Sequence, residues 1–142
     1  MDAEELVKAG YLQKVSPAPD LADKEFTEAD YDLKRARAEL EGEDCKWAIV
    51  KAYYAVFHSA KGVLYLLGYR EKAHFAVGQM LELLSKEGKL EGSFVADFKA
   101  ALSARQGADY HYDYSETLAR EMVDLAEGFV ARMKKLRKEM KG

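Results

Sequence analysis

Apolar residues occupy almost every position of the segment from Cys45 to Gly68, rather than one stripe along it. A helix that is apolar on all sides is typically buried among other helices. Lys46, Lys51 and Lys61 interrupt the segment, and charges at these positions exclude a membrane span. The pattern predicts a buried central helix around which the rest of a helical protein is organised.

On both sides of this segment, apolar residues recur at intervals of three and four, which is the spacing of a helix with one buried face. The helix before it is expected to be capped by Asp20 or Asp23 and to end at Gly42, and Asp44 is expected to cap the central helix. Three helices are expected after it: from about His74 to Lys86, from a cap at Ser93 to about Gly107, and from near Ser115 onward.

Residues 1–19 are expected to form a leader, with a short helix between Asp2 and Val15 followed by a linker that contains both prolines. Proline disfavours helix in the residue before it, so we expect the helix to stop before Pro17. We also expect the leader to pack late or loosely. No segment alternates long enough to predict a strand. The predicted fold class is all-α, an up-and-down antiparallel bundle of five to six helices, in a single domain spanning residues 1–142.

A chain of 142 residues fits one domain with a sizeable core. Its net charge of −3 excludes a protein that binds nucleic acid through an overall basic surface, so such a role needs a local patch. The single cysteine, Cys45, cannot form an internal disulfide, which suits a reducing cytosol. The first residues are acidic and unlike a secretory signal, so a cytoplasmic location is expected.

The end of the last expected helix, residues 132–141, carries six cations and one acidic residue, Glu139. Cations at the C-terminal end of a helix oppose the negative end of its dipole, which is one interpretation of this cluster. The other interpretation is a patch that binds the phosphate groups of a nucleic acid. The sequence leaves both open.

Arg105 lies seven residues after Phe98, on the face of the fifth expected helix that should be buried. Charged side chains are rarely buried without a partner, so an ion pair with Asp109, four residues farther on, is expected. After Gly107 the chain reads Ala-Asp-Tyr-His-Tyr-Asp-Tyr, which predicts a polar aromatic loop held by two helices. Loops on a rigid scaffold often carry binding or catalytic residues.

Arg105 and His111 are separated by five residues, a spacing that resembles the R-x(4–6)-H motif of the HEPN superfamily (higher eukaryotes and prokaryotes nucleotide-binding). The blocks Trp47–His58, His74 and Arg105–Tyr110 are also similar in order and spacing to those of short stand-alone HEPN proteins in bacteria and archaea.

The resemblance spans the chain from about Phe26 to Met133 and implies an antiparallel helical bundle that forms a homodimer, in which two motifs face one cleft. Many HEPN proteins are metal-independent ribonucleases of toxin–antitoxin and related systems. Others bind nucleotides or accompany a small nucleotidyltransferase. RNA or a nucleotide is therefore the expected ligand, with no cofactor, and the expected enzyme class is a metal-independent endoribonuclease. The alternative is a non-catalytic binding partner of a nucleotidyltransferase or of another protein.

The resemblance also implies roles for individual side chains. Arg105 would hold a phosphate through two parallel hydrogen bonds, and His111 would move the proton of a ribose 2′-hydroxyl. The other candidates would orient these two groups or contact the ligand: Gln106, Asp109, Tyr110, Tyr112 and His74. Gln106 cannot titrate, whereas HEPN nucleases often carry Asn, Asp or His after the arginine, and this departure favours binding over cleavage.

Two other histidine-containing arrangements are weaker candidates. His58 lies on the central helix and is expected to be a core histidine held by a tyrosine or by the backbone. His111, Asp109 and Asp113 could be drawn as a metal site, but no second helix supplies a His-x-x-Glu pair to complete it. We therefore expect no native metal.

Overall fold

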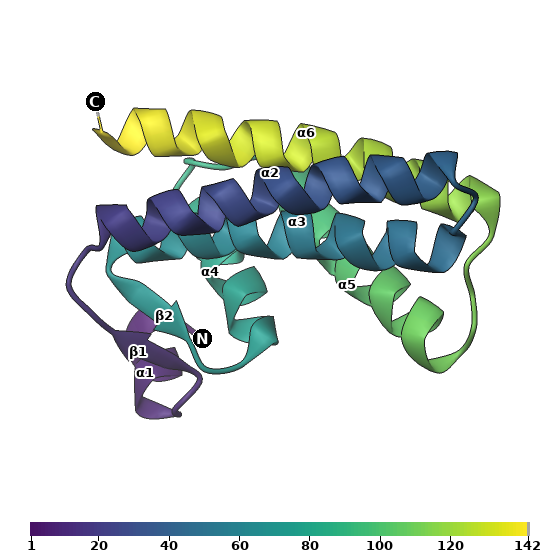
Figure 1. Cartoon of the computed structure of the whole chain (residues 1–142). Helices are drawn as coiled ribbons and strands as arrows, with labels where there is room; N and C mark the ends of the chain where they lie inside the picture. The colour runs from purple at the N-terminus through teal and green to yellow at the C-terminus, as the bar shows by residue number, and fades with distance from the viewer. Residues whose placement is uncertain (142) are drawn as a thin grey trace.

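The computed structural model describes residues 1–141, which form six α-helices and one small antiparallel sheet (Figure 1). In chain order the elements are α1 (Ala3–Lys8), β1 (Leu12–Lys14), α2 (Pro19–Glu41), α3 (Cys45–Leu67), β2 (Tyr69–Glu71), α4 (His74–Lys86), α5 (Gly92–Tyr110) and α6 (Glu116–Lys141). The all-α fold class predicted from the pattern of apolar residues is confirmed.

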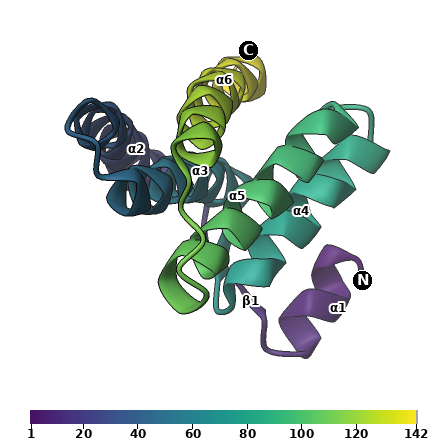
Figure 2. The ribbon, with the colours of Figure 1, turned by 90° about the vertical axis from the view of Figure 1, so that its right-hand side faces the viewer.

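The long helices α2, α3 and α6 lie side by side, and α4 and α5 pack against another side of α3 (Figure 1, Figure 2). Helix α1 and the sheet lie beside α4, near the end of α3. Helix α3 thus contacts all the other long helices, as its apolar sequence predicted. Within residues 1–141, no helix combines the length and the apolar character that crossing a membrane requires.

Both ends of α3 are set by the residues that the sequence indicated. The Asp44 side chain caps the first turn by accepting a hydrogen bond from the Trp47 N–H at 3.2 Å. After Leu67, the backbone of Gly68 turns with φ +89°, a conformation that residues with a Cβ rarely adopt. A Cβ on Gly68 would also lie 2.9 Å from the Val15 carbonyl oxygen, so this turn requires glycine.

A close contact between α2 and α3 depends on Gly62. A Cβ at this position would lie 2.7 Å from Cε2 of the Phe26 ring in α2, so the ring occupies the space that a side chain would fill. The other side of the ring faces α6, where the Arg137 guanidinium carbon lies 4.8 Å from the ring centre. One buried phenylalanine therefore joins the three longest helices.

The leader differs from the prediction in two respects. Its helix ends at Lys8 rather than near Val15, and the chain then forms β1, which pairs with β2 so that Leu12 lies opposite Glu71. Leu6 and Leu12 are 0% and 2% exposed, so the expected loose packing is wrong. Strands of three residues are too short to show alternation, which explains why the sequence pattern did not predict them.

Helices α2 and α5 start without the caps that we expected. Helix α2 begins at Pro19 with no side-chain cap, so neither Asp20 nor Asp23 has that role. Proline suits this first position because its missing N–H would have no partner there. Helix α5 begins at Gly92, which places Ser93 inside the first turn rather than at the cap.

Replacing Gly62 by alanine tests the contact between α2 and α3. The new Cβ would overlap the Phe26 ring, and overpacking of this kind costs about 1–3 kcal/mol. Alanine gains only about 1 kcal/mol over glycine in a helix, so we expect a net loss in the free energy of unfolding, measured by urea denaturation.

Gly128 in α6 provides the matched control, because nothing lies within 4 Å of the position of its Cβ. Gly128→Ala should therefore stabilise the protein, by up to about 1 kcal/mol. A Gly62→Ala variant that is as stable as Gly128→Ala would contradict the close contact.

Candidate functional site

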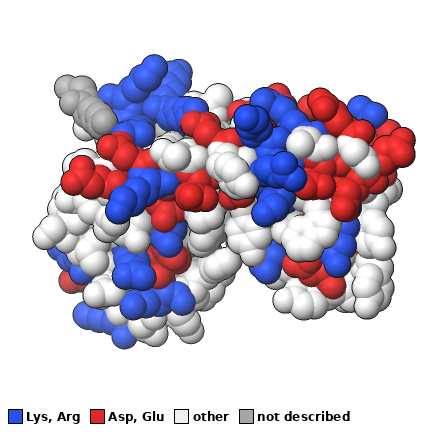
Figure 3. Space-filling view, viewed as in Figure 1, with Lys and Arg blue, Asp and Glu red and all other residues white. Residues whose placement is uncertain are grey.

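One stripe of α3 is not covered by the neighbouring helices, and it is polar and aromatic. Its members recur every three or four residues and are exposed or half-buried: Trp47, Lys51, Tyr54, His58 and Lys61. Figure 3 shows a notch between the lobe that contains α4 with the small sheet and the lobe that contains the end of α5. Side chains from α2, α4 and α5 meet the stripe, and the candidate site lies among them.

Arg105 of α5 lies over two aromatic rings of α3. Its guanidinium carbon is 5.4 Å from the ring centre of Tyr53 and 5.6 Å from that of Tyr54. Arg105 Nε lies 3.2 Å from Asp109 Oδ2, which confirms the expected ion pair. The side chain is 22% exposed, and its buried Nε makes no hydrogen bond within residues 1–141. The protein thus holds the guanidinium in place while leaving donor capacity unused.

His74, the first residue of α4, contacts the same tyrosine as Arg105. The Tyr53 hydroxyl and His74 Nδ1 are 2.8 Å apart, and the imidazole stacks on Phe57 with ring centres 4.2 Å apart. Burial and the positive charge of Arg105 lower the pKa of His74, so the ring is neutral near pH 7. We refer to Arg105, Tyr53 and His74 as the Arg–Tyr–His cluster.

Tyr53 is the member of this cluster that the sequence analysis missed. It lies among the apolar residues of the central helix and is 1% exposed, so its spacing is that of an ordinary core aromatic. Burial raises the pKa of Tyr53 well above its usual range, so the hydroxyl stays protonated. A buried tyrosine hydroxyl usually has a hydrogen-bond partner, and this rule is the one feature of the sequence that could have indicated a polar role for Tyr53.

Farther along the stripe, an ionic network joins α2, α3 and β2. His58 Nδ1 lies 2.6 Å from Glu25 Oε2, and His58 Nε2 lies 3.7 Å from Asp32 Oδ2. Lys61 Nζ lies 3.6 Å from Glu25 Oε1 and 3.3 Å from Glu71 Oε1. His58 is therefore held by carboxylates, rather than by the tyrosine or backbone group that we expected.

Helix α5 continues to Tyr110, beyond Gly107 where we expected the loop to begin. The backbone N–H groups of His111 and Asp113 then both donate to the Gly107 carbonyl oxygen at 3.0 Å and close the helix. Tyr110 and Tyr112 are 68% and 74% exposed, so both rings are available to another molecule. In the described part of the chain, no group of three His, Cys, Asp or Glu side chains is arranged to hold a metal ion.

The two residues of the arginine–histidine motif face different sides of α5. Six positions along a helix turn a side chain by about 240°. His111 and Gln106 line a pocket of about 510 Å³ together with Leu118 of α6, whereas Arg105 lies against α3. Within one chain, the structure brings Arg105 together with Asp109 and His74, and it places His111 and Gln106 on the side that faces α6.

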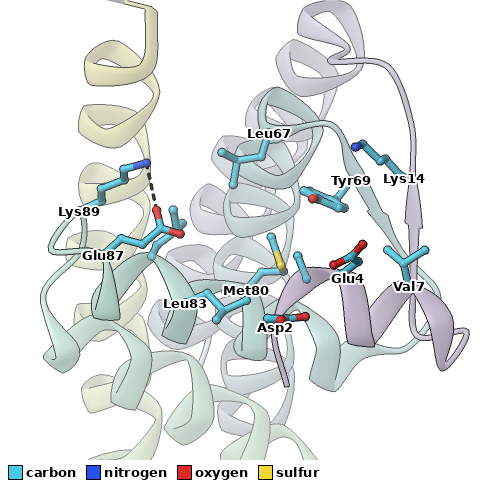
Figure 4. A pocket seen from close by; sticks show the side chains of 12 residues that line it. Asp2, Glu4, Val7, Lys14, Leu67, Tyr69, Met80, Leu83, Glu87 and Lys89 are labelled. Atoms are coloured by element: carbon cyan, nitrogen blue, oxygen red, sulfur yellow. Dashed lines mark ion pairs between the residues drawn. The ribbon is translucent and has the colours of Figure 1, made fainter.

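A larger cavity, of about 700 Å³, lies between α1, α4 and the end of α3 (Figure 4). Apolar side chains such as Leu67 and Met80 line it, and Glu87 and Lys89 form an ion pair of 3.0 Å at its edge. None of the candidate residues contributes to its wall. The size of this cavity therefore supports neither the Arg105 side nor the His111 side of α5 as the functional site.

The basic end of α6 appears in Figure 3 as a group of Lys and Arg side chains near the C-terminus. Three of these cations pair with acidic residues of other elements: Arg132 with Glu91, Lys134 with Asp30, and Arg137 with Asp23. The pairs join α6 to α2 and to the start of α5. Three of the six cations are therefore used in packing α6 against its neighbours and are not available to a phosphate patch. These pairs do not test the helix-dipole interpretation.

Comparison with known proteins shows the family. The family model described as the HEPN domain matches residues 22–136, which include the whole Arg–Tyr–His cluster. A protein of Methanocaldococcus jannaschii named "Putative toxin MJ0605" is 34% identical over 114 residues, which cover 79% of this chain and 85% of that protein. The chain belongs to the HEPN family, as the order and spacing of its motifs predicted.

The ionic network around His58 makes the stability of the protein depend on pH. Burial by itself lowers the pKa of His58, but the hydrogen bond with Glu25 and the negative charges of Glu25 and Asp32 outweigh burial and raise it. Charged His58 therefore stabilises the fold fully below its ordinary pKa of about 6.5. This contribution is lost as the pH rises through the raised value of the folded state.

We therefore expect the free energy of unfolding of the wild-type protein to exceed that of His58→Gln most at about pH 6, with a smaller excess at about pH 9. Urea denaturation at a series of pH values would measure both proteins. Subtracting the two profiles removes the contributions of other titrating groups. An excess that stays constant with pH would show that the network does not stabilise charged His58.

Proposed function

We propose that this protein binds RNA or a nucleotide through Arg105 and acts as a toxin-like HEPN protein. The family, and the name of the relative from Methanocaldococcus jannaschii, support this proposal. The observation that carries it is the state of Arg105, which is mostly buried, lies over two tyrosine rings and has an Nε without a hydrogen bond. The side chain is still 22% exposed, so the two terminal nitrogens of the guanidinium could donate hydrogen bonds to a phosphate group.

The guanidinium suits a phosphate because it is planar, always charged and able to donate two parallel hydrogen bonds. Tyr53 and Tyr54 support it from α3, and Asp109 holds it from within α5. A side chain that is already ordered loses less conformational entropy when a ligand binds. This preorganisation is the physical reason for preferring Arg105 to the exposed cations of the surface.

We propose RNA cleavage as the reaction of this site. The ribose 2′-oxygen attacks the adjacent phosphorus, and a new O2′–P bond forms as the P–O5′ bond breaks. A histidine accepts the 2′ proton, water supplies the proton that the leaving 5′-oxygen takes up, and Arg105 stabilises the phosphoryl charge. The motif assigns the proton transfer to His111, with Gln106, Asp109 and Tyr110 as orienting residues. DNA lacks the 2′-hydroxyl and would not be cut.

We also propose that the protein is a homodimer. Arg105 and His111 face different sides of α5, so a site that uses both of them needs a contribution from a second copy. Exposed aromatic rings of Trp47, Tyr110 and Tyr112 offer apolar surface for such a contact. Sedimentation of the purified protein would measure its oligomeric state. A monomer would exclude a site that takes Arg105 from one copy and His111 from the other.

A mixed RNA pool incubated with purified protein in excess EDTA tests the reaction. We expect cleavage that survives EDTA and yields 2′,3′-cyclic phosphate ends, with no cleavage of DNA of the same sequence. The His111→Ala variant should lose this cleavage, because the motif assigns the proton transfer to His111. The absence of cleavage by folded wild-type protein would favour the alternative of a non-catalytic partner of a nucleotidyltransferase or another protein.

Arg105→Ala tests the binding step separately from cleavage. Hydrogen bonds to charged groups contribute about 1.5–3 kcal/mol, so we expect the affinity for fluorescently labelled RNA to fall at least about tenfold. Arg120→Ala is the matched control, since Arg120 is an exposed arginine of α6 that pairs with Glu116. Circular dichroism should show the same helix content in both variants. An unfolded Arg105→Ala protein, or equal affinities, would assign Arg105 a structural role.

A further inference from the structure

We propose that Arg105 and His74 together form the phosphate-binding site, that Tyr53 positions His74 in it, and that His74, rather than His111 of the same chain, contacts the bound phosphate. The ligand class is the phosphate of a nucleotide or of an RNA strand. This inference rests on the proposed function and names the residues that would carry it.

Tyr53 connects the two binding groups. Its ring lies under the Arg105 guanidinium, with 5.4 Å between the guanidinium carbon and the ring centre, and its hydroxyl lies 2.8 Å from His74 Nδ1. One buried side chain of α3 thus fixes a donor group from α5 and another from α4. The two groups are far apart in the sequence and meet only because both helices pack on α3.

The hydrogen bond to Tyr53 determines which nitrogen of His74 can meet a ligand. Within residues 1–141 the Tyr53 hydroxyl has no other hydrogen-bond partner, so we assign it as the donor to Nδ1, and the neutral imidazole then carries its proton on Nε2. A phosphate oxygen accepts a hydrogen bond from this Nε2–H. His74 is exposed while its ring stacks on Phe57, so the ring is both held and accessible.

The surroundings of His74 favour an anion. Arg105 from α5 and His58 and Lys61 from α3 contribute positive charge near the ring, and Glu71 from β2 opposes them. His74 also begins α4, whose first turn has no side-chain cap. The positive end of the helix dipole therefore adds to the charge of Arg105 at the same place.

His111 lacks these features in a single chain. It is exposed at the end of α5, and within residues 1–141 no side chain makes a hydrogen bond with its ring. Its pocket is formed with α6, on the side of α5 away from Tyr53. A histidine without a partner has no fixed tautomer, which makes it a poorer phosphate donor than His74.

The first test follows the imidazole nitrogens of the three histidines by long-range proton–nitrogen NMR, with His→Gln variants to assign them. The probe is adenosine 5′-monophosphate, and adenosine is the control that lacks the phosphate. We expect the monophosphate to shift the His74 signals and leave those of His111 unchanged, and adenosine to shift neither. Arg105→Ala should abolish the shift.

The second test compares affinities for the monophosphate and for a short RNA strand, which separates the two sources of phosphate. His74→Asn keeps a partner for the Tyr53 hydroxyl but lacks a donor at Nε2, so we expect a loss of about tenfold or more. His74→Gln places an amide N–H near Nε2 and should restore most of the affinity. Arg120→Ala, at the exposed ion pair with Glu116, is the matched control and should bind as the wild-type protein does, and His111→Asn is measured beside it.

Tyr53→Phe tests the positioning role. It keeps the ring under Arg105 and removes only the hydroxyl, so the fold should remain intact while His74 loses its fixed tautomer. The NMR signals of His74 in the free protein should then change toward a mixture of tautomers, and the affinity for the monophosphate should fall. Unchanged tautomer signals would overturn the role of Tyr53.

The outcomes separate this inference from the proposed function. Loss of binding in Arg105→Ala and His111→Asn, with His74→Asn unaffected, would overturn the inference and leave the proposed function standing. Wild-type protein that binds neither the monophosphate nor RNA would overturn both. If the monophosphate shifts the His111 signals instead of the His74 signals, the inference is overturned, and His111 is the histidine that contacts the phosphate.

Discussion

Helix α3 is apolar around most of its circumference, and this property dictates the packing of the other long helices. Each of α2, α4, α5 and α6 covers part of that surface, and the cost of leaving any part in water is the main force that assembles the molecule. Where α2 approaches most closely, Gly62 admits the Phe26 ring. The remaining stripe of α3 stays open, and polar side chains occupy it.

The open stripe explains the position of the candidate site. Polar groups next to a large apolar core are partly desolvated, so their interactions are stronger than those of surface groups. Arg105 lies over tyrosine rings there, and His74 shares the hydroxyl of Tyr53. The same desolvation keeps His74 neutral and Tyr53 protonated. The groups are thus ordered before a ligand arrives, which lowers the entropic cost of binding it.

The stripe contains two kinds of polar cluster. Around His58, carboxylates of α2 and β2 meet the imidazole and Lys61 in a network of opposite charges, although the buried Glu71 Oε2 makes no hydrogen bond within residues 1–141. Around Arg105, one aspartate faces the guanidinium and Nε has no hydrogen bond within residues 1–141. A buried polar atom without a hydrogen bond is uncommon, and each of the two clusters contains one in the described part of the chain, Glu71 Oε2 and Arg105 Nε.

The sequence by itself determined the helical architecture, the central position of α3 and both of its ends, because apolar periodicity, Asp44 and Gly68 act through local geometry. It also determined the family, and the pair between Arg105 and Asp109 one helical turn apart. Only the tertiary structure decided the pairing of β1 with β2 and the meeting of Arg105 with Tyr53 and His74. These contacts join residues distant in the chain, and no local pattern encodes how far α4 and α5 rotate as they pack on α3. The same packing places His111 toward α6, whereas Arg105 lies against α3.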